Sequence, residues 1–475
     1  MEATMKEQLL PNNVEDLKKK IWNESKKMWI VSAPAILIRF STFGVNVVSQ
    51  AFVGHIGATE LAAYTLVYSV LLRFSNGILV GMNSGFGTLH GQAFGAKQYQ
   101  NLGIYLQQGW IVLPTVSTIL CPLLVFAAPI LKAFGQDQLI ADTTGIIALW
   151  FIPLTFSFAV LCASNMFLQS QSKIIVLSCL STFSLLVHVF LSWLLTVRFE
   201  FGMTGAMVST TLAYWIPNVG QIIYIVCGGC RETWRGFTAL AFKDLGHTVK
   251  IGVTSCLMFS LEFWYDAVLI LLSGNMVNAE VSVDALSICL NMSGWAQMIS
   301  TGFMATASVR VANELGRGNA GAAKFSILMI LVTSFSIALV VFVVFIVLRD
   351  QLAYAFTTSE EVAGEVARLS PLLGYSLLLN GVQPILSGVA AGAGRQATVT
   401  YVNLASYYLI GIPLAVILGF SLNLQVQGVW IGMTIGSTVQ TVILVVMTCM
   451  TDWDEQICLA HKRINRPLIS ELPRN

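Results

Sequence analysis

Two acidic residues lie where acidic residues are energetically costly. Of the 24 Asp and Glu residues, all but two fall in polar tails, in loops or at the ends of apolar runs; the exceptions are Glu262 and Asp266. Their spacing of four residues places both on one face of a helix, about one turn apart. Burial and a like-charged neighbour each favour the protonated form, so the two groups should titrate together. We expect a site that binds and releases a proton here; the alternative is a pair that stays neutral and hydrogen-bonded.

Two basic residues lie at similar depth in the first half of the chain. Arg39 and Arg73 are each roughly 15 Å from the start of their apolar run, too deep for the side chain to reach water easily. Either they face a water-filled cavity, where they would attract anions, or they clamp neighbouring helices through hydrogen bonds. Both alternatives remain open from the sequence.

Other polar and aromatic groups are candidates for a substrate path. Pockets for amphipathic organic compounds combine a few polar anchors with aromatic walls, although each group alone also suits ordinary packing between helices. The candidates nearest the expected path are Asn46, Gln50, Tyr64, Tyr68, Asn83, Trp295, Tyr375 and Tyr407. Pro34 and Pro384 interrupt the backbone hydrogen-bond ladder and are expected to bend their helices.

The composition is that of a membrane protein. Of the 475 residues, 56% are hydrophobic and 11% are charged, and the mean hydropathy is +0.74. A net charge of +2 gives no basic surface for nucleic acid. The chain has no HExxH pair and no GxxxxGK[ST] loop, and Cys227 and Cys230 form a CxxC without a second pair. We therefore expect no enzyme activity, no metal site and no cofactor.

Apolar runs of this length and number predict an all-α polytopic protein, because about 20 apolar residues span a bilayer. The twelve predicted spans are 29–54, 61–91, 103–133, 140–167, 174–198, 204–229, 247–275, 282–313, 322–348, 362–391, 397–421 and 427–450.

The distribution of basic residues orients these spans. Loops after even-numbered spans are rich in Lys and Arg, as are both tails, so both termini are predicted to be cytosolic. The predicted parts are a cytosolic tail 1–28, a first lobe 29–229, a cytosolic connection 230–246, a second lobe 247–450 and a cytosolic tail 451–475.

The two halves also form an internal repeat. SQAFVGHIGATEL from Ser49 aligns with SGNMVNAEVSVDA from Ser273 at an offset of 224, and Gly205 aligns with Gly428 at an offset of 223. Each half has six predicted spans, so both enter the membrane from the same side. This predicts two six-helix lobes related by a parallel repeat, with the substrate path between them.

Several stretches resemble the multidrug and toxic compound extrusion transporters, in particular their plant detoxification group. The resemblance covers about residues 28–450 and rests on VSQAFVGHIGATELAA, GTLHGQAFGA, FLQSQSK, LEFWYDAVLILLSG, SVRVANELGRGN, GVAAGAGRQ, YVNLASYYLIGIPLA and GVWIGM. It implies a V-shaped pair of lobes that exports organic compounds in exchange for protons or sodium ions. It also implies a coupling role for Glu262, which stands where eukaryotic members keep a carboxylate. Further acids of the family are replaced here by Ala267, Asn291 and Asn380, although both asparagines can still hydrogen-bond a carboxyl group.

The sequence thus predicts a monomeric secondary antiporter that exports xenobiotics or secondary metabolites, such as flavonoids or organic cations, across the vacuolar or plasma membrane. Its expected partners are a small organic substrate, protons and the lipid bilayer. One rival is an anion channel or anion transporter that uses Arg39 and Arg73. A second rival is a major-facilitator transporter, which the loop GQAFGAKQYQNLG disfavours because it lacks that family's acidic-then-basic motif.

Overall fold

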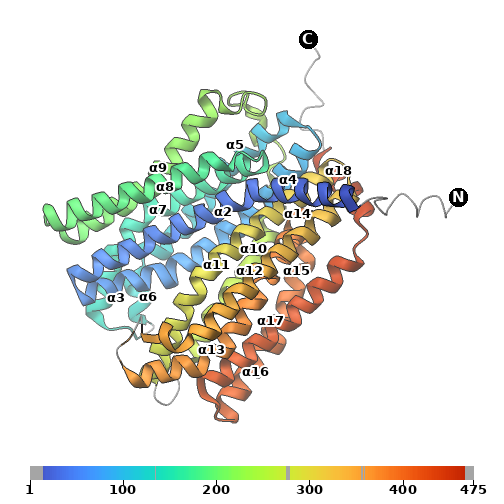
Figure 1. Ribbon diagram of the computed structural model, residues 1–475. Coiled ribbons are helices and arrows are strands. Elements are labelled where there is room, and N and C mark those ends of the chain that lie inside the picture. Colours follow the sequence, from blue (N-terminus) through green and yellow to red (C-terminus); the bar gives the residue numbers. More distant parts are fainter. Residues whose placement is uncertain (1–13, 134, 274–278, 355–356, 358, 466–475) are drawn as a thin grey trace.

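The computed structural model describes residues 14–133, 135–273, 279–354, 357 and 359–465. Helices are the regular elements throughout this part of the chain (Figure 1). In the first half the six helical segments are α2 (Val14–Ile56); α3 (Ala58–Leu66), π-helical η1 (Val67–Leu72) and α4 (Arg73–Gly95); α5 (Tyr99–Val125) and α6 (Ala127–Ala133); α7 (Gln138–Ser170); α8 (Ile174–Ser192) and η2 (Trp193–Arg198); and α9 (Gly202–Tyr224) with η3 (Ile225–Gly229).

The second half repeats this arrangement after a connection that contains a short 3-10 helix, η4 (Ala239–Phe242). Its six segments are α10 (Leu245–Ser273); α11 (Ala279–Gly316); α12 (Ala320–Tyr354); α13 (Glu360–Asn380) and α14 (Gln383–Ala393); α15 (Gln396–Asn403), η5 (Leu404–Gly411), α16 (Ile412–Val416) and η6 (Ile417–Ser421); and α17 (Gln425–Met450). A final helix, α18 (Trp453–Ile464), follows the last segment.

The predicted spans agree with these segments. Each falls within one observed segment, apart from the last two residues of 247–275, which lie outside the described residues. Nine of the described segments are long and apolar enough to cross a membrane by length and composition. The helices extend past the apolar runs, most of all at α2, where the basic stretch before residue 29 is already helical.

Backbone conformation confirms the internal repeat. Glu200 and Asn423, which are 223 residues apart, share a φ of +53°. Gly205 and Gly428, at the same offset, each lie against the backbone of the preceding segment, at Leu195 and Leu418 respectively. Only a glycine fits where two helix backbones approach this closely. The same close contact between consecutive helical segments therefore occurs in both halves.

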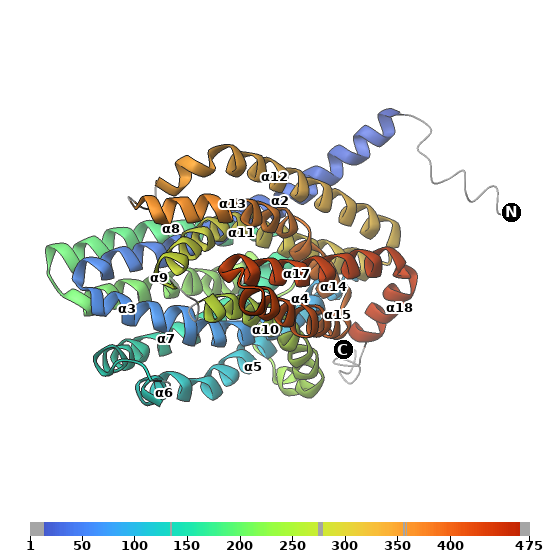
Figure 2. The ribbon, with the colours of Figure 1, turned by 90° about the horizontal axis from the view of Figure 1, so that it is seen from below.

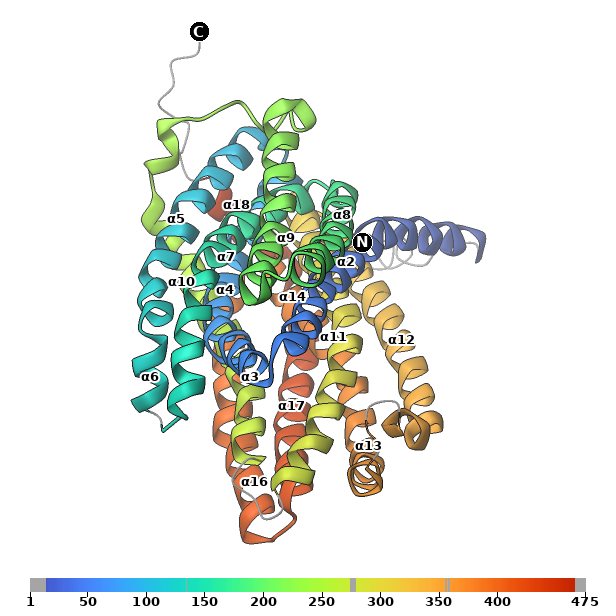
Figure 3. The same cartoon turned by 90° about the vertical axis from the view of Figure 1, so that its left-hand side faces the viewer.

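Each half packs around its own apolar core. Phe86, Leu106 and Phe167 belong to the core of the first lobe, and Leu369 and Val429 belong to that of the second. In Figure 3 most helices of the first half lie toward the upper left and most of those of the second half toward the lower right, while α10 and α18 lie beside helices of the first half. The chain is thus two lobes, each with an interior that can persist while the contact between them changes.

The lobes meet where α4 lies along α10 and α11. A Cβ added to Gly81 would come within 2.5 Å of Cys256 Cα, and one added to Gly85 within 3.0 Å of Gly252 Cα. The small residues on α4 therefore let two helix backbones pack directly against each other, as small-residue stripes do in membrane proteins.

Hydrogen bonds join the lobes at one end of this contact. Thr88 Oγ1 donates to the carbonyl of Ala391 (2.7 Å), and Gln92 Nε2 donates to that of Gly392 (3.1 Å). Asn313 Nδ2 donates to the carbonyl of Ser170 (3.1 Å). These bonds lie beside the loops after even-numbered segments. At the other end the lobes diverge, since α3 and α16 lie far apart in Figure 1 and again in Figure 3.

Candidate functional site

Glu262 lies in the middle of α10, partly buried, and contacts another element of the second lobe. Its Oε1 accepts a hydrogen bond from Nε2 of Gln383, the first residue of α14. The same Gln383 nitrogen lies 3.3 Å from Ser387 Oγ, one turn further along α14. A carboxyl group, an amide and a hydroxyl thus form a short polar chain inside the second lobe.

A helix break brings Gln383 to this position. The tenth segment is not one helix: α13 ends at Asn380, and α14 begins at Gln383. Pro384 stands in the first turn of α14. A backbone N–H at this position has no carbonyl partner within the helix, so proline, which lacks this N–H, breaks no hydrogen bond. Pro384 therefore starts a helix after a break, which differs from the predicted bend within one helix. Pro34 lies inside α2, and the bend expected there stays a prediction.

Neighbouring segments hold the α10 backbone around Glu262. The hydroxyl of Tyr408 donates to the carbonyl of Leu261 (3.1 Å), and Asn403 Nδ2 donates to that of Met258 (3.1 Å). Asn403 in turn accepts from Gln440 Nε2 on α17 (2.9 Å). Hydrogen bonds within the second lobe therefore fix the position of the helix that carries Glu262. An amide donor favours the ionised carboxylate and burial favours the neutral acid, so opposing influences act on the same proton.

Of the residues predicted to accompany Glu262, some lie outside the described residues, and the others are not the ones that contact it. The side chains of Asp266 and Ala267 lie outside the described residues, so the coupled pair of carboxylates stays a prediction. Asn291 is exposed and donates to the carbonyl of Ser287 in its own helix (3.0 Å). Asn380 is the last residue of α13, on the other side of the break from Gln383. The amide that contacts Glu262 is therefore three residues beyond the predicted one.

Replacing Gln383 with Met should move the pH dependence of transport upward. Without the amide N–H the ionised form of Glu262 loses a donor, so the protonated form persists to higher pH. The measurement is the pH midpoint of substrate exchange in liposomes. Gln138→Met, the same change at an exposed position, is the control; a midpoint for Gln383→Met that is equal to or below the wild-type midpoint contradicts the contact.

The tyrosines Tyr64 and Tyr407 lie in the lobe cores. Tyr64 is 1% exposed and packs against Phe151, with 5.6 Å between ring centroids. Tyr407 is stacked on Tyr265 at 4.1 Å. Tyr68 is partly buried and stacks on Tyr64 at 6.3 Å. These rings support helix packing within a lobe in this conformation.

The other candidates for the substrate path are more dispersed. Trp295 of α11 packs across the lobes on Phe40 and Phe43 of α2, with centroids 5.8 and 4.7 Å apart. Tyr375 is exposed, and its hydroxyl lies 3.2 Å from Thr438 Oγ1. Asn46 is buried in α2, and Gln50 is partly buried one turn later. Asn83 reaches a hollow in the first lobe.

That hollow also contains Arg39. It has an empty volume of about 1000 Å³ including its open mouth, and its lining includes Arg39, Asn83, Asn165 and Gln169. The structure thus places Arg39 in the cavity environment, one of the two alternatives that the sequence left open. Arg73 is exposed at the first residue of α4 and is not among the lining residues.

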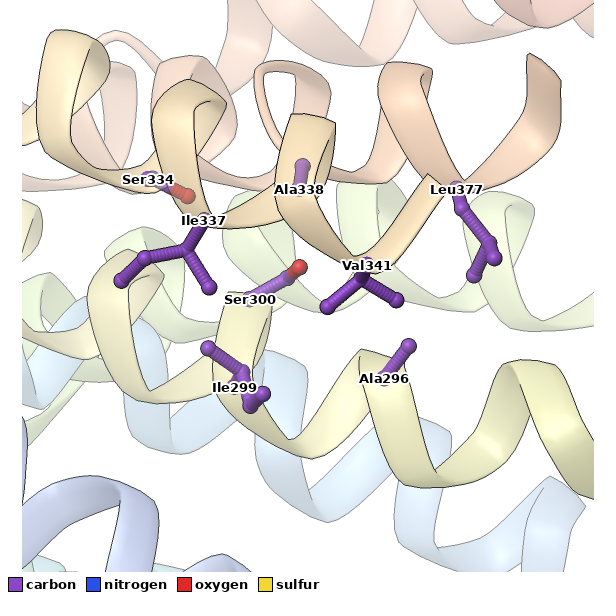
Figure 4. A pocket seen from close by; sticks show the side chains of 8 residues that line it. All are labelled: Ala296, Ile299, Ser300, Ser334, Ile337, Ala338, Val341 and Leu377. Carbon is purple, nitrogen blue, oxygen red and sulfur yellow. The ribbon is translucent and has the colours of Figure 1, made fainter. Parts of the chain in front are cut away.

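A second hollow, in the other lobe, is of a different kind. It has an empty volume of about 260 Å³ and is lined by Ala296, Ile299, Ser300, Ser334, Ile337, Ala338, Val341 and Leu377 (Figure 4). Of these side chains, two serines are polar and none is charged. This hollow between α11, α12 and α13 therefore offers no charged side chain.

Two six-helix lobes with a parallel repeat, with a partly buried acid in one and a partly buried base beside a cavity in the other, define a polytopic membrane transporter. The comparison with known proteins identifies which kind. The MatE family model matches residues 34–194 and 254–417, and the chain belongs to this family of multidrug and toxic compound extrusion transporters. It is therefore a multi-pass efflux transporter and not an enzyme.

Plant relatives match almost the whole chain. Protein DETOXIFICATION 21 of Arabidopsis thaliana is 56% identical over 96% of this chain and 92% of its own length. Protein DETOXIFICATION 20 of the same plant is also 56% identical, over 96% and 93% respectively. Among solved structures, the eukaryotic MATE transporter AtDTX14 superimposes with a TM-score of 0.89 at 34% identity, covering 94% of this chain and 99% of that one. The predicted fold class and family are thereby confirmed.

Proposed function

We propose that the chain exports organic compounds from the cytosol in exchange for protons, and that Glu262 carries the exchanged proton. The observation that carries this proposal is the hydrogen bond from Gln383 to Glu262. It joins the middle of α10 to the start of α14 inside the second lobe. Protonation of Glu262 removes the charge that this donor stabilises, so it changes a contact between two helices of the lobe core.

Coupling requires that the proton bind more tightly to one arrangement of the lobes than to the other, because a ligand with equal affinity for both shifts nothing. The α13–α14 break supplies an element that can respond. At this break the backbone hydrogen-bond ladder is already interrupted, so α14 can change its angle to α13 without breaking a continuous helix. Protons are the proposed coupling ion, with sodium ions the alternative.

The proposed orientation places both termini in the cytosol and the transporter, as a monomer, in the vacuolar or plasma membrane. The loops after even-numbered segments carry the basic excess that favours the cytosolic side. The lobes are joined by hydrogen bonds at that same end. In this orientation the described conformation is closed to the cytosol and diverges toward the opposite side, which is the release state of an exporter.

Purified protein in liposomes tests the proposal against an anion conductor. Proton flux and electrical current are recorded together, first under a chloride gradient and then with organic compounds supplied. An antiporter should move protons only when organic substrate is present, with slow turnover because each cycle needs a lobe rearrangement. Large passive chloride currents without proton counterflow would instead support the channel, for which the position of Arg39 in a cavity is the favouring observation.

A further inference from the structure

The first turns of α2 extend beyond the part of the helix that spans the membrane. α2 begins at Val14, whereas its apolar run begins at residue 29. In Figures 2 and 3 these turns project sideways, away from the other helices of the bundle. We refer to residues 14–28 as the amino-terminal arm. Neither a span of the bilayer nor the contact at Glu262 requires this arm, so its surface needs an explanation of its own.

One face of the arm packs on the second lobe. Glu24 accepts a hydrogen bond from Arg310 of α11, and Met28 is 1% exposed in a core shared with α11 and α12. Lys20 Nζ lies 4.7 Å from the centre of the Phe325 ring of α12. Because Lys20, Glu24 and Met28 follow one another at intervals of four residues, they share one side of the helix. That side is therefore occupied by protein.

The opposite face of the arm carries cations and indole rings. Lys18, Lys19 and Lys26 are exposed, and none of the three forms an ion pair with a residue that the structure describes. Trp22 lies between them and is 73% exposed. Trp29 is seven residues further on, two helical turns away on the same face, and is 39% exposed. The unoccupied face thus combines free ammonium groups with large amphipathic rings.

This combination fits the surface of an anionic bilayer. Trp29 begins the apolar run and therefore marks the edge of the hydrocarbon, and Trp22 is about 10 Å further along the helix. Water offers the apolar body of an exposed indole no contact, whereas the headgroup region offers both apolar contact and hydrogen-bond acceptors. Lysines beside the rings attract negatively charged headgroups. Because the arm continues directly into a membrane span, the bilayer surface lies within its reach without any further partner.

We propose that the amino-terminal arm lies on the bilayer surface and binds the headgroups of anionic phospholipids through Lys18, Lys19 and Lys26, with Trp22 inserted among them. That this surface is the cytosolic one rests on the orientation given under the proposed function; the binding itself does not. Near an anionic membrane each lysine multiplies an association constant by about fivefold, so the three together multiply it by about a hundredfold.

Hydrogen exchange of the full-length wild-type protein tests this inference. The amides of residues 14–28 are followed in nanodiscs of phosphatidylcholine alone and in nanodiscs that also contain phosphatidylserine. We expect exchange in this segment to be slower by about tenfold or more with phosphatidylserine, because bound headgroups suppress fraying of the arm. Equal exchange in the two kinds of nanodisc would overturn the proposal without any need for a variant.

Variants then locate the effect. Replacement of Lys18, Lys19 and Lys26 together by Gln should remove the difference between the two kinds of nanodisc. The matched control removes three exposed cations outside the arm through the changes Arg198→Gln, Arg349→Gln and Arg368→Gln. This control should keep the full difference. A lysine variant that keeps it as well would overturn the proposal.

A soluble headgroup separates the bilayer from a free anion as the occupant. Phosphoserine added to phosphatidylcholine nanodiscs should leave exchange of the arm unchanged; protection equal to that given by phosphatidylserine would indicate a site for free anions and overturn the proposal. Nanodiscs carry the anionic lipid in both leaflets, so the result does not depend on which side is cytosolic. Absence of proton flux from wild-type liposomes would contradict the proposed antiport and leave the lipid result unchanged.

Discussion

Glu262→Gln is expected to abolish exchange driven by a pH gradient, down to the level of empty liposomes, while leaving a folded protein. The amide is nearly isosteric with the carboxylic acid and can still hydrogen-bond Gln383, but it cannot take up or release a proton. If coupling depends on this proton, nothing else at the Gln383 contact replaces it. The measurement is substrate-dependent proton flux in liposomes, with substrate binding in detergent as a separate check of folding.

Glu365→Gln provides the matched control. Glu365 lies on α13 in the same lobe and pairs with exposed Arg368 at 3.7 Å, away from the contact with Gln383. The same chemical change there should leave proton flux unaltered. A Glu262→Gln protein that still responds normally to an imposed pH gradient would remove Glu262 from the mechanism.

Arg310→Met should lower the stability of the closed end. Arg310, on α11, is 8% exposed at its side chain and donates to Glu24 of α2 and, at 3.2 Å, to Glu314 of its own helix. Removal of the guanidinium takes away the shared counter-charge of two buried carboxylates, although Glu24 keeps exposed Lys27 at 3.6 Å and Glu314 keeps exposed Arg317 at 2.9 Å. Breaking a buried pair destabilises a protein by up to about 3–5 kcal/mol when the remaining charge has no partner, so we expect a smaller loss here, but one that exceeds that of an exposed pair. Thermal unfolding in detergent should therefore show a clear fall in melting temperature.

The exposed ion pair between Arg368 and Glu365 is the reference for the expected fall in melting temperature. The side chain of Arg368 is 68% exposed, and pairs of that kind contribute about 0–1 kcal/mol. Arg368→Met should therefore melt close to the wild-type temperature. Equal melting temperatures for the two variants would mean that burial of the Glu24–Arg310 pair contributes nothing.

Hydropathy and charge were sufficient to predict the helices. Apolar runs mark where a helix must satisfy its backbone inside lipid, so each of the twelve predicted spans falls on an observed segment. They do not mark where a helix ends in water, which is why α2 begins at Val14, well before its apolar run. The repeat was readable because glycines such as Gly205 and Gly428 stand where helix backbones touch, and such positions admit no other residue.

The site was predictable only for its charged members. Glu262 and Arg39 stand out because an ionisable group within an apolar run needs a reason to be there. Gln383 has no such signal, since a neutral amide fits many places, and its position depends on a helix break that the apolar pattern of 362–391 conceals. The prediction named Asn380 because the resemblance places an acid of the family there, and Asn380 lies before the break. Arg73 was indistinguishable from Arg39 in sequence, and only the fold separates an exposed position within a continuous helical segment from a cavity.

The far end of α14 is held by the chain's last helix. Arg463 of α18 donates to the carbonyls of Ala393 and Gly394 (2.9 and 3.1 Å). In Figure 2 α18 lies at the right-hand side of the view, beyond α14. Burial lowers the pKa of Arg463 from its ordinary value. A cation at the carbonyl end of a helix also interacts favourably with the helix dipole.

The 11 residues of α14 make a rod of about 16 Å, with Gln383 at one end and the Arg463 contact at the other. Because a helix of this length is rigid, a displacement of α14 at its contact with Arg463 also displaces Gln383, which contacts Glu262. Thermodynamic linkage then runs both ways: whatever factor docking of α18 imposes on proton affinity at Glu262, protonation must impose on docking. If Glu262 carries the exchanged proton, as proposed, cutting or tethering α18 should change the proton affinity of Glu262.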